Sequence, residues 1–357
     1  MKIKLTDQSS SVKGAADSMA EIKLFTIKNN RGTKLIVADC GAAVVSLFVN
    51  DKNGNPADIV LGYDDPYDYL KDEFYIGTVV GRYANRIAGE TVFINDQPYK
   101  LSTKEGGYHQ HGGFVGFNKK LFYSTPFQQQ NKSGIIFKYT SPHLEEGFPG
   151  ELQLEVIYTL DDDDVWTIEY KGISNKTTLV NLTQHTYFNL SGNPATNIDE
   201  HELKILARYY LPVNKLQVPT GELADVSNTP FDFTQFKKIA QDITQDNEQL
   251  ILSKGYDHSF VLEKKYSAVL KHAAVVTEPV SGRKMEVYTT EPAVHFYTGN
   301  FLDNVKGKNG INYNKRAGFC LETQHFPDAP NHPQFPSTIL KAGEQFYSKT
   351  IFKFSAG

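Results

Sequence analysis

The feature that most restricts the fold of this chain is a pair of apolar runs that alternate with period two on either side of an acidic turn. The first run covers residues 152–158, the second covers residues 165–170, and four consecutive aspartates at 161–164 lie between them. Alternation at this period places successive side chains on opposite faces of an extended strand. We therefore predict an antiparallel hairpin whose acidic turn is solvated. A cation site made by the four carboxylates is the alternative.

Similar short runs recur along the chain, whereas helical periodicity is scarce. Strand-like runs cover residues 33–38, 44–49, 134–139, 202–206, 268–276, 285–290 and 349–354. Short helices are predicted only at residues 65–70 and 233–239. Many short strands joined by Gly, Pro and Asn turns are typical of an all-β sandwich or barrel, and the 357 residues are enough for a large core.

Charge and cysteine content exclude several classes of function. The formal net charge of −4 gives no electrostatic reason to expect a nucleic-acid partner. Cys40 and Cys320 are far apart in the sequence, so we expect two buried thiols in a reducing compartment rather than a disulfide framework. The N-terminal segment lacks an apolar run of signal-peptide length, and no segment approaches the ~20 apolar residues of a membrane span. We expect a soluble, cytoplasmic protein with no membrane partner.

Residues 318–331 carry a carboxylate out of an apolar strand and into a sharp turn. Phe319 and Leu321 are expected on one face of that strand, and Glu322 and Gln324 on the other. Prolines at 327, 330, 333 and 336 end regular structure and fix the following loop. A glutamate held at the end of a rigid strand is a good candidate for a general base. The alternative is a glutamate that points into water.

Residues 181–190 form a second candidate segment, directly after a strand-like run at 178–180. In an extended backbone, His185 and Tyr187 share one face with Thr183 and Asn189. That face is polar and aromatic, which suits a ligand better than a dry core. The unperturbed pKa of histidine lies nearest neutrality, so His185 can give and recover a proton within one turnover. The alternative is a histidine held by structural hydrogen bonds.

Six blocks of this sequence resemble, in the same order, signature blocks of the galactose mutarotase (aldose 1-epimerase) family. They are GRYANRI (81–87), HGG (111–113), NLTQHTYFNL (181–190), GYDH (255–258), FYTGN (296–300) and GFCLETQHFPDAPN (318–331). The resemblance runs from about residue 22 to the C-terminus. It implies a single domain over residues 22–357, built as one large antiparallel β-sandwich with a few short helices and a sugar pocket on one sheet. Residues 1–21 are then expected to form an N-terminal arm.

The family resemblance implies the interconversion of the α and β anomers of free aldohexoses such as galactose and glucose, with no cofactor and no metal. The hemiacetal loses its C1 hydroxyl proton while its ring oxygen gains one, the ring opens, C1 rotates, and reclosure gives the other anomer. One base and one acid suffice, each worth about 10²–10⁴ in rate. The resemblance makes Glu322 the base and His185 the acid. We expect a bell-shaped pH profile with Glu322 on its acidic limb and His185 on its alkaline limb.

The resemblance also places the substrate in contact with several polar side chains. These are Asn85, Arg86, His111, His185, Tyr187, Asp257, His295 and Glu322. Guanidinium groups supply fixed, forked donors, and carboxylates accept paired hydrogen bonds from neighbouring hydroxyls. The family commonly has glutamine where this chain has His295. Imidazole also donates and accepts, so we expect retained binding with shifted selectivity among sugars. A monomer and a homodimer both remain open.

Other functions fit parts of the sequence. His109, His111 and His185 form a chemically sound zinc ligand set, which would indicate a metal-dependent hydrolase. A non-catalytic carbohydrate-binding protein can share the same fold, but it would need neither Glu322 nor His185. An epimerase of hexose phosphates would need further cationic groups for the phosphate. A glycosidase would more often use two carboxylates.

Overall fold

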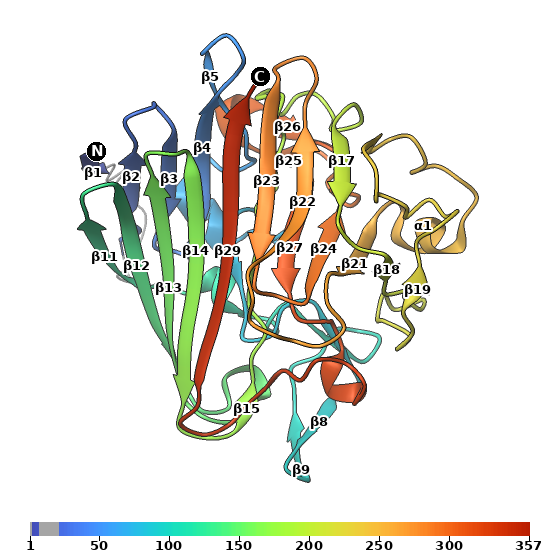
Figure 1. The fold of residues 1–357 in the computed structure, drawn as a ribbon. Coiled ribbons are helices and arrows are strands. Elements are labelled where there is room, and N and C mark those ends of the chain that lie inside the picture. Colours follow the sequence, from blue (N-terminus) through green and yellow to red (C-terminus); the bar gives the residue numbers. More distant parts are fainter. Residues whose placement is uncertain (1, 7–20) are drawn as a thin grey trace.

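Strands dominate the computed structural model of the protein, which describes residues 2–6 and 21–357. The largest sheet has nine antiparallel strands in the order β11-β12-β13-β14-β29-β23-β22-β17-β20 (Figure 1). They are β11 (Tyr123–Gln128), β12 (Lys132–Ser141), β13 (Leu152–Asp161), β14 (Val165–Ser174), β29 (Gln345–Ala356), β23 (Arg283–Thr289), β22 (Lys271–Thr277), β17 (Glu202–Ile205) and β20 (Lys237–Lys238). Seven of the strand-like runs read from the sequence overlap strands of this sheet.

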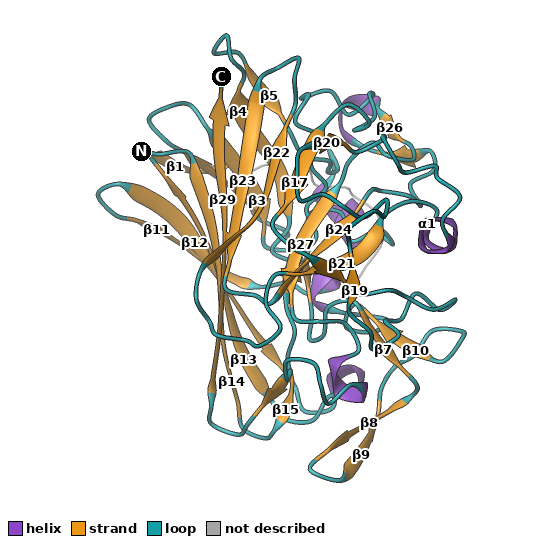
Figure 2. Ribbon diagram, turned by 45° about the vertical axis from the view of Figure 1, so that its right-hand side comes forward, coloured by secondary structure: helices purple, strands orange, loops and turns teal. Residues whose placement is uncertain are grey.

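Two smaller antiparallel sheets of five strands each pack with the large one. The first contains β1 (Lys2–Thr6), β2 (Leu24–Lys28), β3 (Lys34–Ala38), β4 (Val44–Asn50) and β5 (Pro56–Asp58). The second has the order β19 (Ala224–Asp225), β18 (Tyr209–Tyr210), β21 (Asp257–Val261), β24 (Ala293–Tyr297) and β27 (Cys320–Gln324), and lies beside the nine-stranded sheet in Figure 2. One core cluster includes buried residues of all three sheets, among them Phe25, Phe137 and Phe296. The predicted all-β sandwich is therefore confirmed.

The predicted hairpin is confirmed as β13 and β14, which pair along almost their whole length. Val156 is buried in the core while its neighbour Glu155 reaches the surface, as the alternating pattern requires. The acidic turn also contacts the loop between β2 and β3. Asp164 Oδ1 accepts hydrogen bonds from Asn29 Nδ2 and Thr33 Oγ1, both at 2.7 Å. The turn is thus partly anchored rather than fully solvated.

The remaining elements are short and connect the sheets. The strand pairs are β6 (Val79–Val80) with β16 (Thr183–Gln184), β7 (Arg86–Ala88) with β10 (Tyr108–Gln110), β8 (Thr91–Ile94) with β9 (Gln97–Lys100), β15 (Thr178–Leu179) with β28 (Ile339–Leu340), and β25 (Val305–Lys306) with β26 (Asn312–Tyr313). The helices are α1 (Glu248–Ser253) and the 3-10 turns η1 (Pro66–Leu70), η2 (Phe117–Lys119), η3 (Glu145–Gly147), η4 (Lys308–Gly310) and η5 (Ala329–Asn331).

Helix predictions succeed at one place and fail at another. The helix predicted at 65–70 is η1, where the Asp65 side chain caps the Tyr67 N–H at 2.9 Å. The helix predicted at 233–239 is wrong, because this segment contains β20, which pairs with β17. Phe236, needed for its apolar face, is 48% exposed. Helix α1 was not predicted, although Asn247 caps it by accepting from the Gln249 N–H at 3.0 Å.

The N-terminal prediction is only partly covered by the structure. Lys2–Thr6 form β1, which pairs with β2, whereas residues 7–20 of the expected arm lie outside the described residues. The division of the chain into an arm and one domain over residues 22–357 stays a prediction. Cys40 and Cys320 are buried free thiols, as expected. Among the described residues, no helix is long and apolar enough to cross a lipid bilayer.

Candidate active site

Three neighbouring strands of the second five-stranded sheet carry polar side chains to one cavity. Asp257 begins β21, His295 lies in the middle of β24 and Glu322 in the middle of β27. His295 and Glu322 face each other in the register of their strands, so their Cβ atoms are about 4.5–5.5 Å apart. The cavity has a volume of about 170 Å³. Pockets for drug-sized ligands measure ~300–1,000 Å³, so this one suits a single small molecule.

Two loops that bind each other contribute a second group of polar side chains. Asn85 precedes β7 and His111 follows β10, with backbone φ angles of 63° and 50°. The His111 N–H donates to the Asn85 carbonyl at 2.9 Å, and the Asn85 N–H donates to His111 Nδ1 at 3.2 Å. Burial, together with the nearby His185, lowers the pKa of His111 well below its usual range. His111 is therefore neutral, and because Nδ1 accepts, its ring proton lies on Nε2 as a donor.

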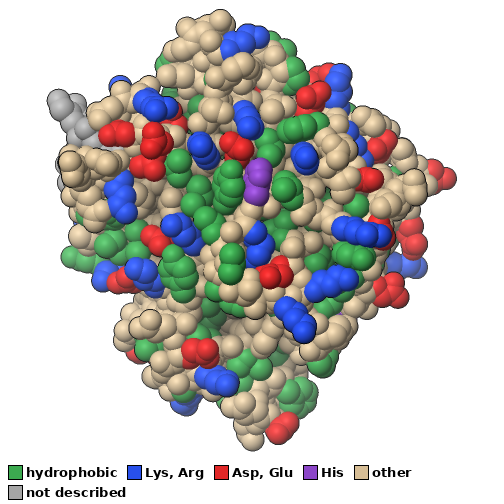
Figure 3. Space-filling view, viewed as in Figure 1, with side chains coloured by type: hydrophobic (Ala, Val, Ile, Leu, Met, Phe, Trp, Pro, Cys, Tyr) green, Lys and Arg blue, Asp and Glu red, His purple; other side chains and the backbone are tan. Residues whose placement is uncertain are grey.

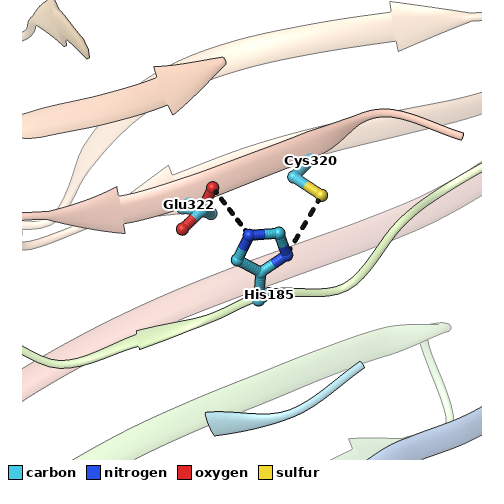
Figure 4. A group of neighbouring side chains, drawn as sticks. All are labelled: His185, Cys320 and Glu322. Atoms are coloured by element: carbon cyan, nitrogen blue, oxygen red, sulfur yellow. Dashed lines mark hydrogen bonds and ion pairs between the residues drawn. The ribbon is translucent and has the colours of Figure 1, made fainter. Parts of the chain in front are cut away.

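His185 lies against β27 and contacts two of its residues (Figure 4). His185 Nε2 is 3.6 Å from Glu322 Oε1, and His185 Nδ1 is 3.5 Å from Cys320 Sγ. Glu322 and Cys320 are alternate residues of one strand and project from the same face, while Leu321 on the opposite face packs in the core. Glu322 is only 1% exposed. The alternative in which this glutamate points into water is therefore wrong.

Burial opposes the charged forms of both Glu322 and His185. It raises the pKa of Glu322 well above its usual range, with a further increase from the charge of Asp257. It lowers the pKa of His185 to about 4. A carboxylate beside an imidazolium holds the same number of protons as a carboxylic acid beside a neutral imidazole. The pair therefore shares one proton. In one state this proton lies on Glu322 Oε1, and in the other it lies on His185 Nε2.

Asp257 is kept ionised by its neighbours in the cavity. His295 Nε2 is 2.7 Å from Asp257 Oδ1, and Arg86 Nη2 is 3.8 Å from Asp257 Oδ2. Burial by itself raises the pKa of Asp257, but the hydrogen bond and charge of His295, together with Arg86, lower it to about 2. Ser259 Oγ lies 2.9 Å from His295 Nδ1 and fixes the other side of that ring. Arg86 Nε is buried without a hydrogen-bond partner among the described residues.

All the site residues named from the sequence line this one cavity. They are Asn85, Arg86, His111, His185, Tyr187, Asp257, His295 and Glu322. Thr183 and Asn189, expected on the face of His185, do not line it. Asn189 Nδ2 instead donates to the Ala317 carbonyl at 2.9 Å. The backbone at 185–190 is irregular rather than a continuous strand, so the period-two argument holds for His185 and Tyr187 but not for Asn189.

Sequence reasoning missed most of the aromatic lining and part of the polar lining. The missed residues are Phe74, Tyr75, Tyr297 and Phe301, with Glu73, Lys104 and Gln110. The rings of Tyr75 and Tyr297 lie 5.9 Å and 6.2 Å from the His185 ring. Tyr297 belongs to the block at 296–300, so the resemblance contained a signal for it. Tyr75 lies in an irregular loop after η1, where no periodic pattern marks it.

The three-histidine zinc set considered from the sequence does not come together. His109 Nδ1 lies 2.8 Å from the Ser102 carbonyl, and the His109 ring packs edge-on against Phe148. Among the described residues, the one group of potential metal donors within 4.8 Å is His185, Cys320 and Glu322. This group takes one ligand atom from each residue and contains only one of the three histidines of the expected zinc set.

A larger groove of about 640 Å³ lies on the solvent-facing side of the nine-stranded sheet, away from the cavity. Its lining includes Lys138, Glu155, Lys171 and Tyr347. Figure 3 shows hydrophobic and charged side chains interspersed over this face of the molecule. Lys138 and Glu155 are joined in an ion pair at 2.6 Å. The groove offers no buried acid–base pair, so the smaller cavity is the candidate active site.

Fold and site together define a β-sandwich protein with a buried carboxylate–imidazole pair in a small polar cavity. A family model described as aldose 1-epimerase matches residues 23–353. The chain belongs to the aldose 1-epimerase family.

Curated relatives and solved structures agree with this assignment. The chain is 44% identical to the galactose mutarotase of Bos taurus, over 94% of each chain. It is 36% identical to the aldose 1-epimerase of Escherichia coli K12, over 94% of this chain and 95% of the relative. A crystal structure of an aldose epimerase homologue from C. elegans superposes with a TM-score of 0.85 at 28% identity, covering 94% of this chain and 99% of that one. The galactose 1-epimerase of Lactobacillus acidophilus gives 0.85 at 26% identity, covering 100% and 99%.

Proposed function

We propose that this protein is an aldose 1-epimerase (mutarotase) that interconverts the α and β anomers of free aldohexoses such as galactose and glucose. The observation that carries the proposal is the buried pair of Glu322 and His185, 3.6 Å apart in a cavity sized for one small molecule. The relatives named galactose mutarotase and aldose 1-epimerase support the same activity. A cytoplasmic location and a monomeric or homodimeric state, both expected from the sequence, belong to the same proposal.

Ring opening needs one proton removed and one proton delivered. The resting pair of carboxylic acid and neutral imidazole reacts through the state in which its shared proton has moved from Glu322 to His185 Nε2. In that state Glu322 takes the proton of the C1 hydroxyl, while His185 gives its Nε2 proton to the ring oxygen. The C1–O5 bond breaks and C1 becomes an aldehyde carbon, which leaves a carboxylic acid and a neutral imidazole. After rotation about C1–C2 the two residues exchange roles, so reclosure restores the carboxylate and the imidazolium. The sum of protons on the pair is unchanged at every stage.

The remaining polar residues would hold the sugar in place for this transfer. Asp257, kept ionised by His295 and Arg86, would accept from adjacent hydroxyls. His111 would donate through Nε2–H, and Asn85 and Arg86 would supply further donors. These contacts form in the ground state as well as in the transition state, so they act mainly on substrate affinity.

Polarimetry of freshly dissolved α-galactose and α-glucose tests the proposal. We expect the approach to rotational equilibrium to accelerate in proportion to protein concentration. Calorimetric titration with the same sugars measures binding alone and so distinguishes an enzyme from a sugar-binding protein. Sugar binding without acceleration would instead indicate a non-catalytic carbohydrate-binding protein. Acceleration only with hexose phosphates would indicate the phosphate-specific alternative.

A further inference from the structure

Cys320 lies on β27, two residues before Glu322, and the proposed reaction gives it no role. Its Sγ lies 3.5 Å from His185 Nδ1, and both side chains are buried. Cys320 and Glu322 alternate on β27, so one strand presents a partner to each nitrogen of the same ring (Figure 4). The rings of Tyr75, His111, Tyr187 and Tyr297 surround His185 at 5.0–6.2 Å. The ring therefore has little freedom to turn away from these two contacts.

In the proposed reaction, Nδ1 is the nitrogen of His185 that keeps its proton throughout. In the proposed reaction, Nε2 gives a proton to the ring oxygen and later recovers it, so between these steps the neutral ring carries its single proton on Nδ1. A buried N–H without an acceptor costs about 1–3 kcal/mol. The backbone carbonyl of His185, which accepts from the Gly77 N–H at 3.0 Å, is a second acceptor near the ring. Cys320 Sγ is the side-chain partner that Nδ1 has.

We propose that Cys320 is a positioning residue for the acid: its sulfur accepts the Nδ1–H bond of His185 and so fixes the tautomer that leaves Nε2 free to give and recover the transferred proton. This inference rests on the proposed function. Burial and the charge of Glu322 raise the pKa of the Cys320 thiol, so the acceptor is a neutral sulfur. Sulfur is a weak acceptor. A carboxylate there would stabilise the imidazolium and weaken it as an acid, whereas a thiol orients the ring without that cost.

Nitrogen-15 NMR of the wild-type protein tests the tautomer directly. With labelled histidine, and His185 assigned by comparison with His185→Asn, we expect one neutral tautomer near pH 7, protonated at Nδ1 and unprotonated at Nε2. A His185 ring protonated at Nε2, or an equal mixture of the two tautomers, would overturn the inference. This measurement needs no activity, so it stands even if the proposed function fails, and absence of mutarotase activity in the wild type would reject the proposed function instead.

Substitutions at Cys320 test its role in turnover. Cys320→Ala should lower kcat roughly 2–10-fold, the range of one ordinary hydrogen bond, with KM nearly unchanged and a mixture of His185 tautomers. Cys320→Ser, which keeps an acceptor, should retain the Nδ1–H tautomer and recover most of kcat. Cys40→Ala removes a second buried thiol of the same hydrophobic cluster and is the matched control. If Cys320→Ala keeps wild-type kcat and tautomer, or if Cys40→Ala lowers kcat equally, the positioning role is rejected.

Discussion

At the scale of single residues, Glu322 is the proposed general base, although its burial disfavours the ionised carboxylate. Glu322→Gln keeps the shape of the side chain but removes its basicity. We expect kcat to fall by about 10²–10⁴, while the affinity for galactose measured by calorimetry changes little. Retention of most of the wild-type kcat would show that Glu322 is not the base.

His185 and Asp257 should respond differently to substitution, because proton transfer belongs to the transition state and hydroxyl contacts also hold the ground state. His185→Asn should lower kcat strongly at similar KM. Asp257→Ala should raise KM on the order of 10–100-fold, the range of a hydrogen bond to a charged group, with a smaller effect on kcat. Steady-state kinetics of both variants checks this division. An unchanged kcat and a raised KM in His185→Asn would contradict it.

The pH profile of kcat/KM should be bell-shaped, but burial reverses the assignment expected from sequence. The active state holds one proton on the pair. Burial lowers the pKa of His185 to about 4 and raises that of Glu322, so the acidic limb follows uptake of a second proton by His185 and the alkaline limb follows loss of the last proton from Glu322.

Asp257 supplies a test of that reversal. Its negative charge raises the pKa of Glu322, so Asp257→Asn should move the alkaline limb of kcat/KM to lower pH. The measurement is the pH dependence of the mutarotation rate in wild type and variant. An alkaline limb that stays in place or moves to higher pH would mean that it does not report Glu322.

The site residues differ in how far the sequence could predict them. Glu322 and His185 were named because each lies in a block of the family. His185 also follows a strand-like run, whereas Glu322, expected at the end of a strand, lies in the middle of β27. Their pKa shifts could not be predicted, because they depend on burial and on Asp257, which is distant in the sequence. Cys320 was predicted as a buried thiol, but its contact with His185 arises from the packing of two segments that lie 135 residues apart.

At the scale of elements, strands were predicted better than helices, because the alternating pattern of a strand can be recognised within a short stretch of sequence. Alternation along residues 152–158 is a property of the strand itself, and it survives in β13. The apolar spacing at 233–239 also fits a helix, yet the segment is short and pairs with β17. Tertiary contacts decide whether such a short segment forms a helix or a strand, since isolated helices of this length are unstable.

A buried lysine joins η4 to the first five-stranded sheet and gives a test of stability at this scale. Lys308 Nζ donates to Asp58 Oδ2 at 2.6 Å and to the Val45 and Val60 carbonyls at 2.7 Å and 2.9 Å. Lys308→Met leaves two buried carbonyls and the half-buried Asp58 carboxylate without their cation, so we expect a loss of about 3–5 kcal/mol in the free energy of unfolding. Chemical denaturation measures it, with the exposed Lys306→Met as the control. Equal stability of the two variants would contradict this account.

At the scale of the whole molecule, the sequence indicated a sandwich but not its arrangement. No local pattern shows that β29, the last strand, inserts between β14 and β23. That insertion completes the large sheet against which β24 and β27 pack, as the shared core cluster shows. The candidate active site thus depends on pairings between distant parts of the chain, which only the folded structure reveals.

The central claim is that protein side chains alone carry both proton transfers. The measurement that tests it most directly is polarimetry of α-galactose with protein dialysed against EDTA, compared with undialysed protein and with samples that receive zinc, NAD or ATP. We predict the same mutarotation rate in every sample, because Glu322 and His185 supply the base and the acid. Activity that disappears on dialysis and returns only with a divalent ion would contradict the account.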